Sequence, residues 1–217
     1  MRIHRLAPLA LILVTPATAT AGTRLPLTVR VYDMSADPTD RTRSFAAVAR
    51  VLAPANVELQ WLSGPLATRE TPAPQDLVVR LVRQDTVATR PGQMALGYAV
   101  VDAAGRRGTV ATIFLERVEW LARISGADVE ELTGLAIAHE ISHLLLGSPT
   151  HTARGLMRAR WTTDEIRAGH PADWQLGRRE RDQLRAGLAA RLGTRRTPES
   201  PRVAALSVRA QAEPTLR

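Results

Sequence analysis

The stretch that decides the fold is VEELTGLAIAHEISHLLLGSPTHTARGLM, residues 129–157. It contains the pattern H-E-x-x-H, formed by His139, Glu140 and His143. On an α-helix, residues four apart lie on one face, so the two histidines can direct their imidazole nitrogens at a single metal ion. Glu140 projects at a neighbouring angle, where it can reach a water molecule without binding the ion itself. The motif therefore predicts a helix with two metal ligands and an adjacent carboxylate.

Both ends of this helix are signalled in the sequence. Asp128 is a residue type that caps helix N-termini, and Glu131 three residues later supplies the acidic partner of a capping box. Gly147 is the residue type that most readily ends a helix in a left-handed conformation. Between these ends, residues 132–146 are apolar almost all round, which predicts a helix inside the protein. Because buried imidazole and carboxylate groups are costly without a partner, a metal ion is favoured there.

A third histidine follows the helix. Ser148 and Pro149 cannot easily continue it, so the chain turns and delivers His151. Three of the five histidines of the chain thus lie within thirteen residues. H-E-x-x-H is short enough to occur by chance, but two ordinary helix histidines would be expected on a solvated face. Three imidazoles would leave a tetrahedral zinc ion one open position, as catalytic zinc sites require.

The stretch resembles the active site of the metzincins, a clan of zinc metallopeptidases with the pattern H-E-x-x-H-x-x-G-x-x-H and a downstream Met-turn. This chain has the variant H-E-x-x-H-x-x-x-G-x-x-x-H, with one extra residue before Gly147 and another after it. The departure concerns the position of His151. The segment Gly155-Leu156-Met157 resembles the Met-turn, whose methionine forms a hydrophobic floor under the metal in that family. Taken alone, Met157 would be interpreted as a core residue.

The resemblance implies a zinc-dependent endopeptidase, and the signal peptide described below adds that it is secreted. In it, Zn²⁺ is the cofactor, and its ligands are His139, His143 and His151. Glu140 is the general base that takes a proton from the attacking water and carries it to the leaving amine. The expected substrate is a protein or peptide in an extended conformation.

Two alternatives stay open. The third ligand could come from Glu165 or Asp164, as in zincins with a downstream carboxylate, since Glu165 lies twenty-two residues past His143. The chain could also be an exported zinc-binding or protein-binding module without turnover. Retention of zinc and loss of peptide hydrolysis on replacing Glu140 would separate an enzyme from such a module.

Periodicity along the chain predicts an α/β domain of the α+β, zincin-like type. Strands are expected at 27–33, 57–62, 77–82, 97–101 and 109–115, and helices at 40–52, 116–124, 128–146, from 162 onward and at 178–192. These elements predict a mixed, mostly parallel five-stranded sheet, a central zinc-binding helix and a small C-terminal helical part. By resemblance, residues 97–101 form the antiparallel edge strand over the active-site cleft.

The two ends of the chain have their own signals. Arg2 and Arg5, an apolar run at 6–14 and small residues ending at Ala21 predict a Sec-type signal peptide, residues 1–21, cleaved after Ala21. The apolar run is too short to span a bilayer, and export to the periplasm or medium is expected. A single catalytic domain is expected at 22–193, followed by a flexible Arg- and Pro-containing tail at 194–217. There is no cysteine, so no disulfide can form.

The net charge of +8 is unevenly distributed along the chain. Residues 24–173 contain 17 Arg and 17 Asp plus Glu, so the excess lies in the signal peptide and the C-terminal segment. The high isoelectric point therefore gives no support to nucleic-acid binding by the domain. A monomer without a membrane span is expected.

Overall fold

The computed structural model describes residues 23–35, 40–64, 71–83, 95–102, 104–105 and 107–193. The signal peptide predicted at 1–21 and the tail predicted at 194–217 lie outside the described residues, and both stay predictions. Within the described part of the chain, no helix is long and apolar enough to cross a membrane.

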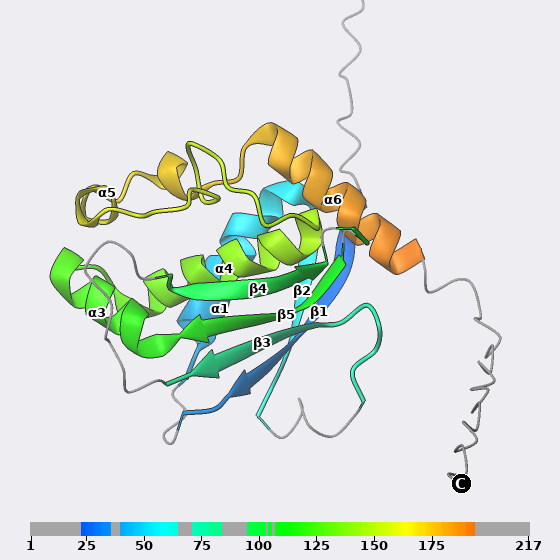
Figure 1. The fold of residues 1–217 in the computed structure, drawn as a ribbon, viewed down its shortest axis with the longest axis horizontal. Coiled ribbons are helices and arrows are strands. Elements are labelled where there is room, and N and C mark those ends of the chain that lie inside the picture. Colours follow the sequence, from blue (N-terminus) through cyan, green and yellow to red (C-terminus); the bar gives the residue numbers. More distant parts are fainter. Residues whose placement is uncertain are drawn as a thin grey trace, which may run out of the picture.

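A five-stranded sheet forms one layer of the domain (Figure 1). Its strands are β1 (Leu25–Asp33), β2 (Val57–Ser63), β3 (Leu77–Val82), β4 (Gly97–Asp102) and β5 (Arg107–Phe114), in the order β2-β1-β3-β5-β4. Neighbouring strands are parallel except for β4, which runs antiparallel to β5. The predicted mixed, mostly parallel sheet with an antiparallel edge strand is therefore confirmed.

The helices are α1 (Thr42–Leu52), α3 (Leu115–Ser125), α4 (Val129–Leu146), α5 (Thr163–Ala168) and α6 (Arg178–Gly193), with the 3-10 turns η1 (Ala53–Ala55) and η2 (Pro171–Trp174). Helix α4 packs on β4 and β5 and is flanked by α1, α3 and α6 (Figure 1). In the last part of the described chain, α5 packs on α3 and α6 packs on α4. The central helix and the small C-terminal helical part are thus as predicted, whereas η2 was not predicted.

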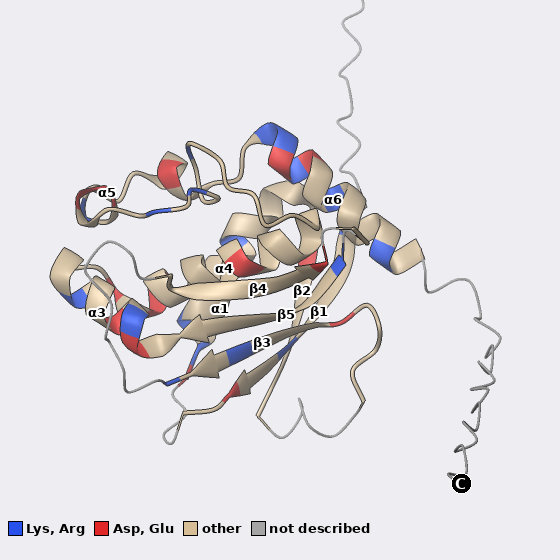
Figure 2. Cartoon of the chain, viewed as in Figure 1, with Lys and Arg blue, Asp and Glu red and all other residues tan. Residues whose placement is uncertain are grey.

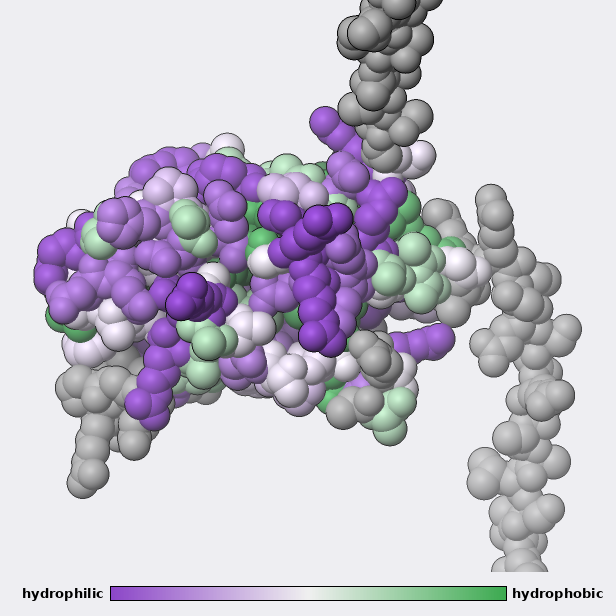
Figure 3. Space-filling view, turned by 90° about the horizontal axis from the view of Figure 1, so that it is seen from above, coloured by the Kyte–Doolittle hydropathy of each residue, from purple (hydrophilic) through white to green (hydrophobic). Residues whose placement is uncertain are grey.

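Charged residues of both signs are spread over the helices and strands (Figure 2). The face seen from above is mostly hydrophilic, with smaller hydrophobic areas between the hydrophilic residues (Figure 3).

The ends of α4 follow the sequence signals. The Asp128 side chain accepts a hydrogen bond from the Glu131 amide at 2.9 Å, and Gly147 ends the helix with φ 59°. The Glu131 carboxylate pairs with Arg50 of α1, so the predicted capping box is wrong although the Asp128 cap is present. Every residue from 132 to 145 is buried, which explains why this helix is apolar all round.

Two glycines let other helices approach α4 closely. A Cβ on Gly134 would lie 2.6 Å from the Ala47 Cβ of α1, and one on Gly187 of α6 would collide with the Leu145 carbonyl. Helices α1 and α6 therefore contact the backbone of α4, which fixes its position between them.

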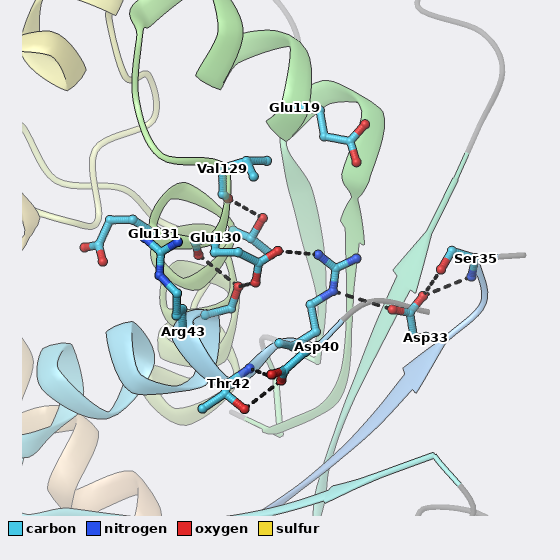
Figure 4. A network of polar contacts seen from close by, with 12 residues as sticks. Asp33, Ser35, Asp40, Thr42, Arg43, Glu119, Val129, Glu130 and Glu131 are labelled. Carbon is cyan, nitrogen blue, oxygen red and sulfur yellow. Dashed lines mark hydrogen bonds and ion pairs between the residues drawn. The ribbon is translucent and has the colours of Figure 1, made fainter. Parts of the chain in front are cut away.

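A polar network holds the N-terminus of α4 (Figure 4). Arg41 is buried and donates to Glu130 Oε1 at 2.7 Å, and its Nε lies 3.5 Å from Asp33 Oδ2 at the end of β1. The Ser44 hydroxyl donates to the same Glu130 carboxylate at 2.6 Å. The start of α4 is thereby tied to both α1 and β1.

The contact at Gly134 predicts a stability effect. The substitution Gly134→Ala should lower the free energy of unfolding by about 1–3 kcal/mol, because the added methyl group overpacks the α1–α4 contact. Gly193→Ala is the control, since nothing lies within 4 Å of a Cβ there. Urea unfolding of both variants tests this, and a Gly134→Ala protein as stable as the parent would contradict the close packing.

Candidate metal centre

Three histidine side chains meet at one point. His139 and His143 lie one turn apart on α4, with their Nε2 atoms 3.1 Å from each other. His151, in the segment after Gly147, places its Nε2 3.3 Å from that of His143. All three ligand atoms lie within 4.8 Å of one another. Four nitrogens arranged tetrahedrally about 2.0–2.1 Å from zinc are roughly 3.3 Å apart, so the two distances from His143 fit such an ion.

Backbone carbonyls decide which nitrogen of each α4 histidine carries the proton. His139 Nδ1 lies 2.9 Å from the Leu156 carbonyl oxygen, and His143 Nδ1 lies 2.8 Å from that of Ser148. Because a carbonyl oxygen only accepts, each Nδ1 is the donor and each Nε2 presents a lone pair. Two lone pairs at 3.1 Å repel each other unless a cation lies between them. The donor set therefore fits a metal ion, and the carbonyls orient the rings toward it.

Burial favours the uncharged form of each ring and of the carboxyl group beside them. It lowers the pKa of His139 to about 4 and also lowers the pKa values of His143 and His151. Neutral imidazole is the form that binds metal. Burial raises the pKa of Glu140 to about 8, and a cation at the three nitrogens would oppose this shift by favouring the carboxylate.

The histidines and Glu140 border a cleft of about 650 Å³. The cleft is lined by residues of β4 and α3, including Gly97, Tyr98 and Trp120, and also by Trp161. A Cβ on Gly97 would lie 3.1 Å from Glu140 Cγ, so the edge strand passes directly beside the carboxylate-bearing residue. The prediction that residues 97–101 form an edge strand over the cleft is confirmed.

The predicted Met-turn, residues 155–157, contacts the Nδ1 side of the His139 ring. Gly155 has φ +75°, the Leu156 carbonyl oxygen accepts a hydrogen bond from His139 Nδ1, and Met157 is buried at 1% exposure. These positions agree with a turn that supports the metal centre. The specific role of the Met157 thioether as a floor under the metal stays a prediction.

The alternative carboxylate ligands are engaged elsewhere. Glu165 accepts from Arg158 Nη1 at 2.6 Å and forms a capping box with Thr162 at the start of α5. Asp164 accepts from Arg167 at 2.9 Å. The structure therefore brings His151, and neither of these carboxylates, to the other two histidines.

Sequence reasoning did not identify the groups that support the ligands. The Ser148 and Leu156 acceptors are backbone carbonyls, which every residue carries, so residue type gives no signal for them. The Trp161 indole also donates to the Leu156 carbonyl, at 3.3 Å. The only available hint was a tryptophan shortly after the predicted Met-turn.

Among the comparisons with known proteins, only the one with solved structures gave a match. No protein-family model and no curated protein matches the chain. Among solved structures, the fold is similar to that of an archaemetzincin from Methanopyrus kandleri, with 17% sequence identity and a TM-score of 0.47. The match covers 79% of this chain and 99% of that chain. At this level of similarity, the chemistry of the site is inferred from its own geometry.

The geometry predicts which residues retain metal. The parent protein should bind one zinc ion per chain. His151→Ala should weaken binding by more than about 100-fold, since changes in supporting residues alone cost 10–100-fold. Glu165→Ala should bind zinc like the parent, because its carboxylate lies with Arg158. Metal analysis after dialysis against a chelator measures this, and loss of zinc only in Glu165→Ala would reverse the ligand assignment.

Proposed function

We propose that the protein is a zinc-dependent endopeptidase. Its zinc ligands are His139, His143 and His151, and Glu140 is its general base. The observation that carries this proposal is the convergence of three imidazole Nε2 atoms beside a buried glutamate in one cleft. Three ligands of this kind leave a tetrahedral ion one position for water or substrate.

The donor set favours zinc as the metal. The chain has no cysteine, and the cluster consists of three imidazoles, two of them oriented by carbonyls. When bound, zinc supplies a Lewis acid that activates water and polarises the scissile carbonyl.

Glu140 is placed to move the proton that hydrolysis requires. It follows His139 directly, is 7% exposed and borders the same cleft. Its carboxylate would accept a proton from water as the water oxygen bonds to the carbonyl carbon. The C–N bond then breaks, and Glu140 delivers this proton to the leaving nitrogen. The apolar surroundings that raise the pKa of Glu140 also make it a stronger base than a carboxylate in water.

The edge strand supports a peptide as the substrate. Among the described strands, β4 pairs only with β5, and Gly97, Tyr98 and Ala99 line the cleft. An extended peptide can add to such an edge through main-chain hydrogen bonds. This mode does not require a free peptide end, which favours an endopeptidase.

Export is part of the proposal. The basic residues, apolar run and small residues before Ala21 support secretion or a periplasmic location. A cysteine-free chain with a substantial buried core does not depend on disulfide formation in such a compartment.

The variant Glu140→Gln tests the proposed base. It should retain zinc and lose hydrolysis of an unstructured protein by about 10²–10⁴-fold, because the amide cannot accept the proton. Glu131→Gln is the matched control on the same helix, and it should cleave like the parent. A chelator should abolish cleavage by the parent, and added zinc should restore it.

Two outcomes would contradict this function. A zinc-loaded Glu140→Gln protein that cleaves as fast as the parent would show that Glu140 is not the base. A parent protein that binds zinc but cleaves no peptide would favour a binding module without turnover.

A further inference from the structure

The Leu156 carbonyl oxygen accepts from two ring N–H groups. His139 Nδ1 lies 2.9 Å from it and Trp161 Nε1 lies 3.3 Å from it. We propose that Trp161 is a positioning residue for the metal centre: it holds the carbonyl that orients His139. This inference rests on the proposed function only in taking His139 as a metal ligand.

The turn that carries this carbonyl is held in place by its other backbone groups. The Leu156 amide donates to the Gln175 carbonyl at 3.0 Å, and the Thr152 amide donates to the Met157 carbonyl at 2.9 Å. Gly155 lies so close to the same Gln175 carbonyl that a Cβ would be 2.6 Å from it. These contacts fix the position of the turn. The hydrogen bonds from His139 Nδ1 and Trp161 Nε1 then orient the Leu156 carbonyl.

The Trp161 ring is itself held from two sides. Its edge-to-face contact with His139 has a centroid distance of 5.7 Å, and that with Trp174 of η2 has a distance of 5.1 Å. The Arg158 guanidinium lies over the Trp174 ring at 5.3 Å and pairs with Glu165 of α5 at 2.6 Å. These contacts pack η2 and α5 beside the Trp161 ring, whereas the hydrogen bond to the Leu156 carbonyl comes from Trp161 itself.

The indole N–H distinguishes positioning from simple packing. A residue needed only to fill space beside His139 would need an aromatic ring but no donor. The bond between His139 Nδ1–H and the carbonyl sets both the ring orientation and the nitrogen that faces the metal. Partners bonded directly to a ligand typically contribute 10–100-fold in metal affinity. Trp161 acts one bond further out, so an effect of about tenfold is expected from the same principle.

The test compares zinc dissociation constants of the parent, Trp161→Phe and Trp174→Phe, measured by competition with a chromophoric chelator. Trp161→Phe keeps an aromatic ring and removes the donor, and should raise Kd about tenfold. Trp174→Phe is the matched control: it keeps an aromatic ring against Trp161 and leaves the Trp161 indole N–H in place, so Kd should stay within about threefold of the parent. Melting temperatures of the zinc-free proteins show whether each variant is folded.

A measurement on the parent protein keeps the test independent of variant folding. By NMR, the Trp161 indole proton should exchange slowly with solvent, and more slowly still after zinc is added. Fast exchange, as for a solvent-exposed indole, would overturn the inference. So would an unchanged Kd for Trp161→Phe, or equal losses in both variants.

Failure of this inference can be separated from failure of the proposed function. A parent that binds zinc and cleaves peptides, with Trp161→Phe unchanged in zinc affinity, contradicts the role of Trp161 alone. A parent that binds no zinc contradicts both.

Discussion

The site depends on three imidazole rings whose ligand nitrogens meet at one point on the wall of the cleft. His139 and His143 cannot relieve their repulsion by moving a proton to Nε2, because each would then lose the hydrogen bond from Nδ1 to a backbone carbonyl. A cation is the partner that satisfies this arrangement. The segment after α4 brings the carbonyl and the third histidine of this arrangement into place. The left-handed cap at Gly147 turns the chain so that the Ser148 carbonyl meets His143, and His151 then returns to the cluster.

The position of α4 explains how such a cluster is held. Close contacts at Gly134 and Gly187 fix the helix between α1 and α6, and the Arg41–Glu130 pair holds its N-terminus. The helix is buried from 132 to 145, so its histidines have little freedom to move. Ligands on a rigid, packed element are positioned more accurately than ligands on loops. His151, which is exposed and lies in the following segment, depends more on the turns that flank it.

Much of the fold could be predicted because the signals are local. The Asp128 cap, Gly147 and the apolar run specify α4, and H-E-x-x-H places its ligands. Boundaries elsewhere shifted slightly: β5 ends at Phe114 and α3 begins at Leu115, where strand and helix share an apolar sequence. The turn η2 and the donor role of Trp161 were not predicted. They depend on contacts between residues that local periodicity cannot relate, and on carbonyls that no side chain identifies. The two extra residues of the motif are accommodated around Gly147, since His151 still reaches His143.

The central claim is that three imidazoles share one ion. X-ray absorption spectroscopy at the zinc edge of the zinc-loaded protein tests it most directly, because it reports the number and type of ligands in solution. The account predicts scattering from three imidazole rings bound at about 2.0–2.1 Å, with an oxygen ligand completing the site. A spectrum showing two imidazoles with carboxylate ligands, or zinc bound without ordered imidazole scattering, would contradict it.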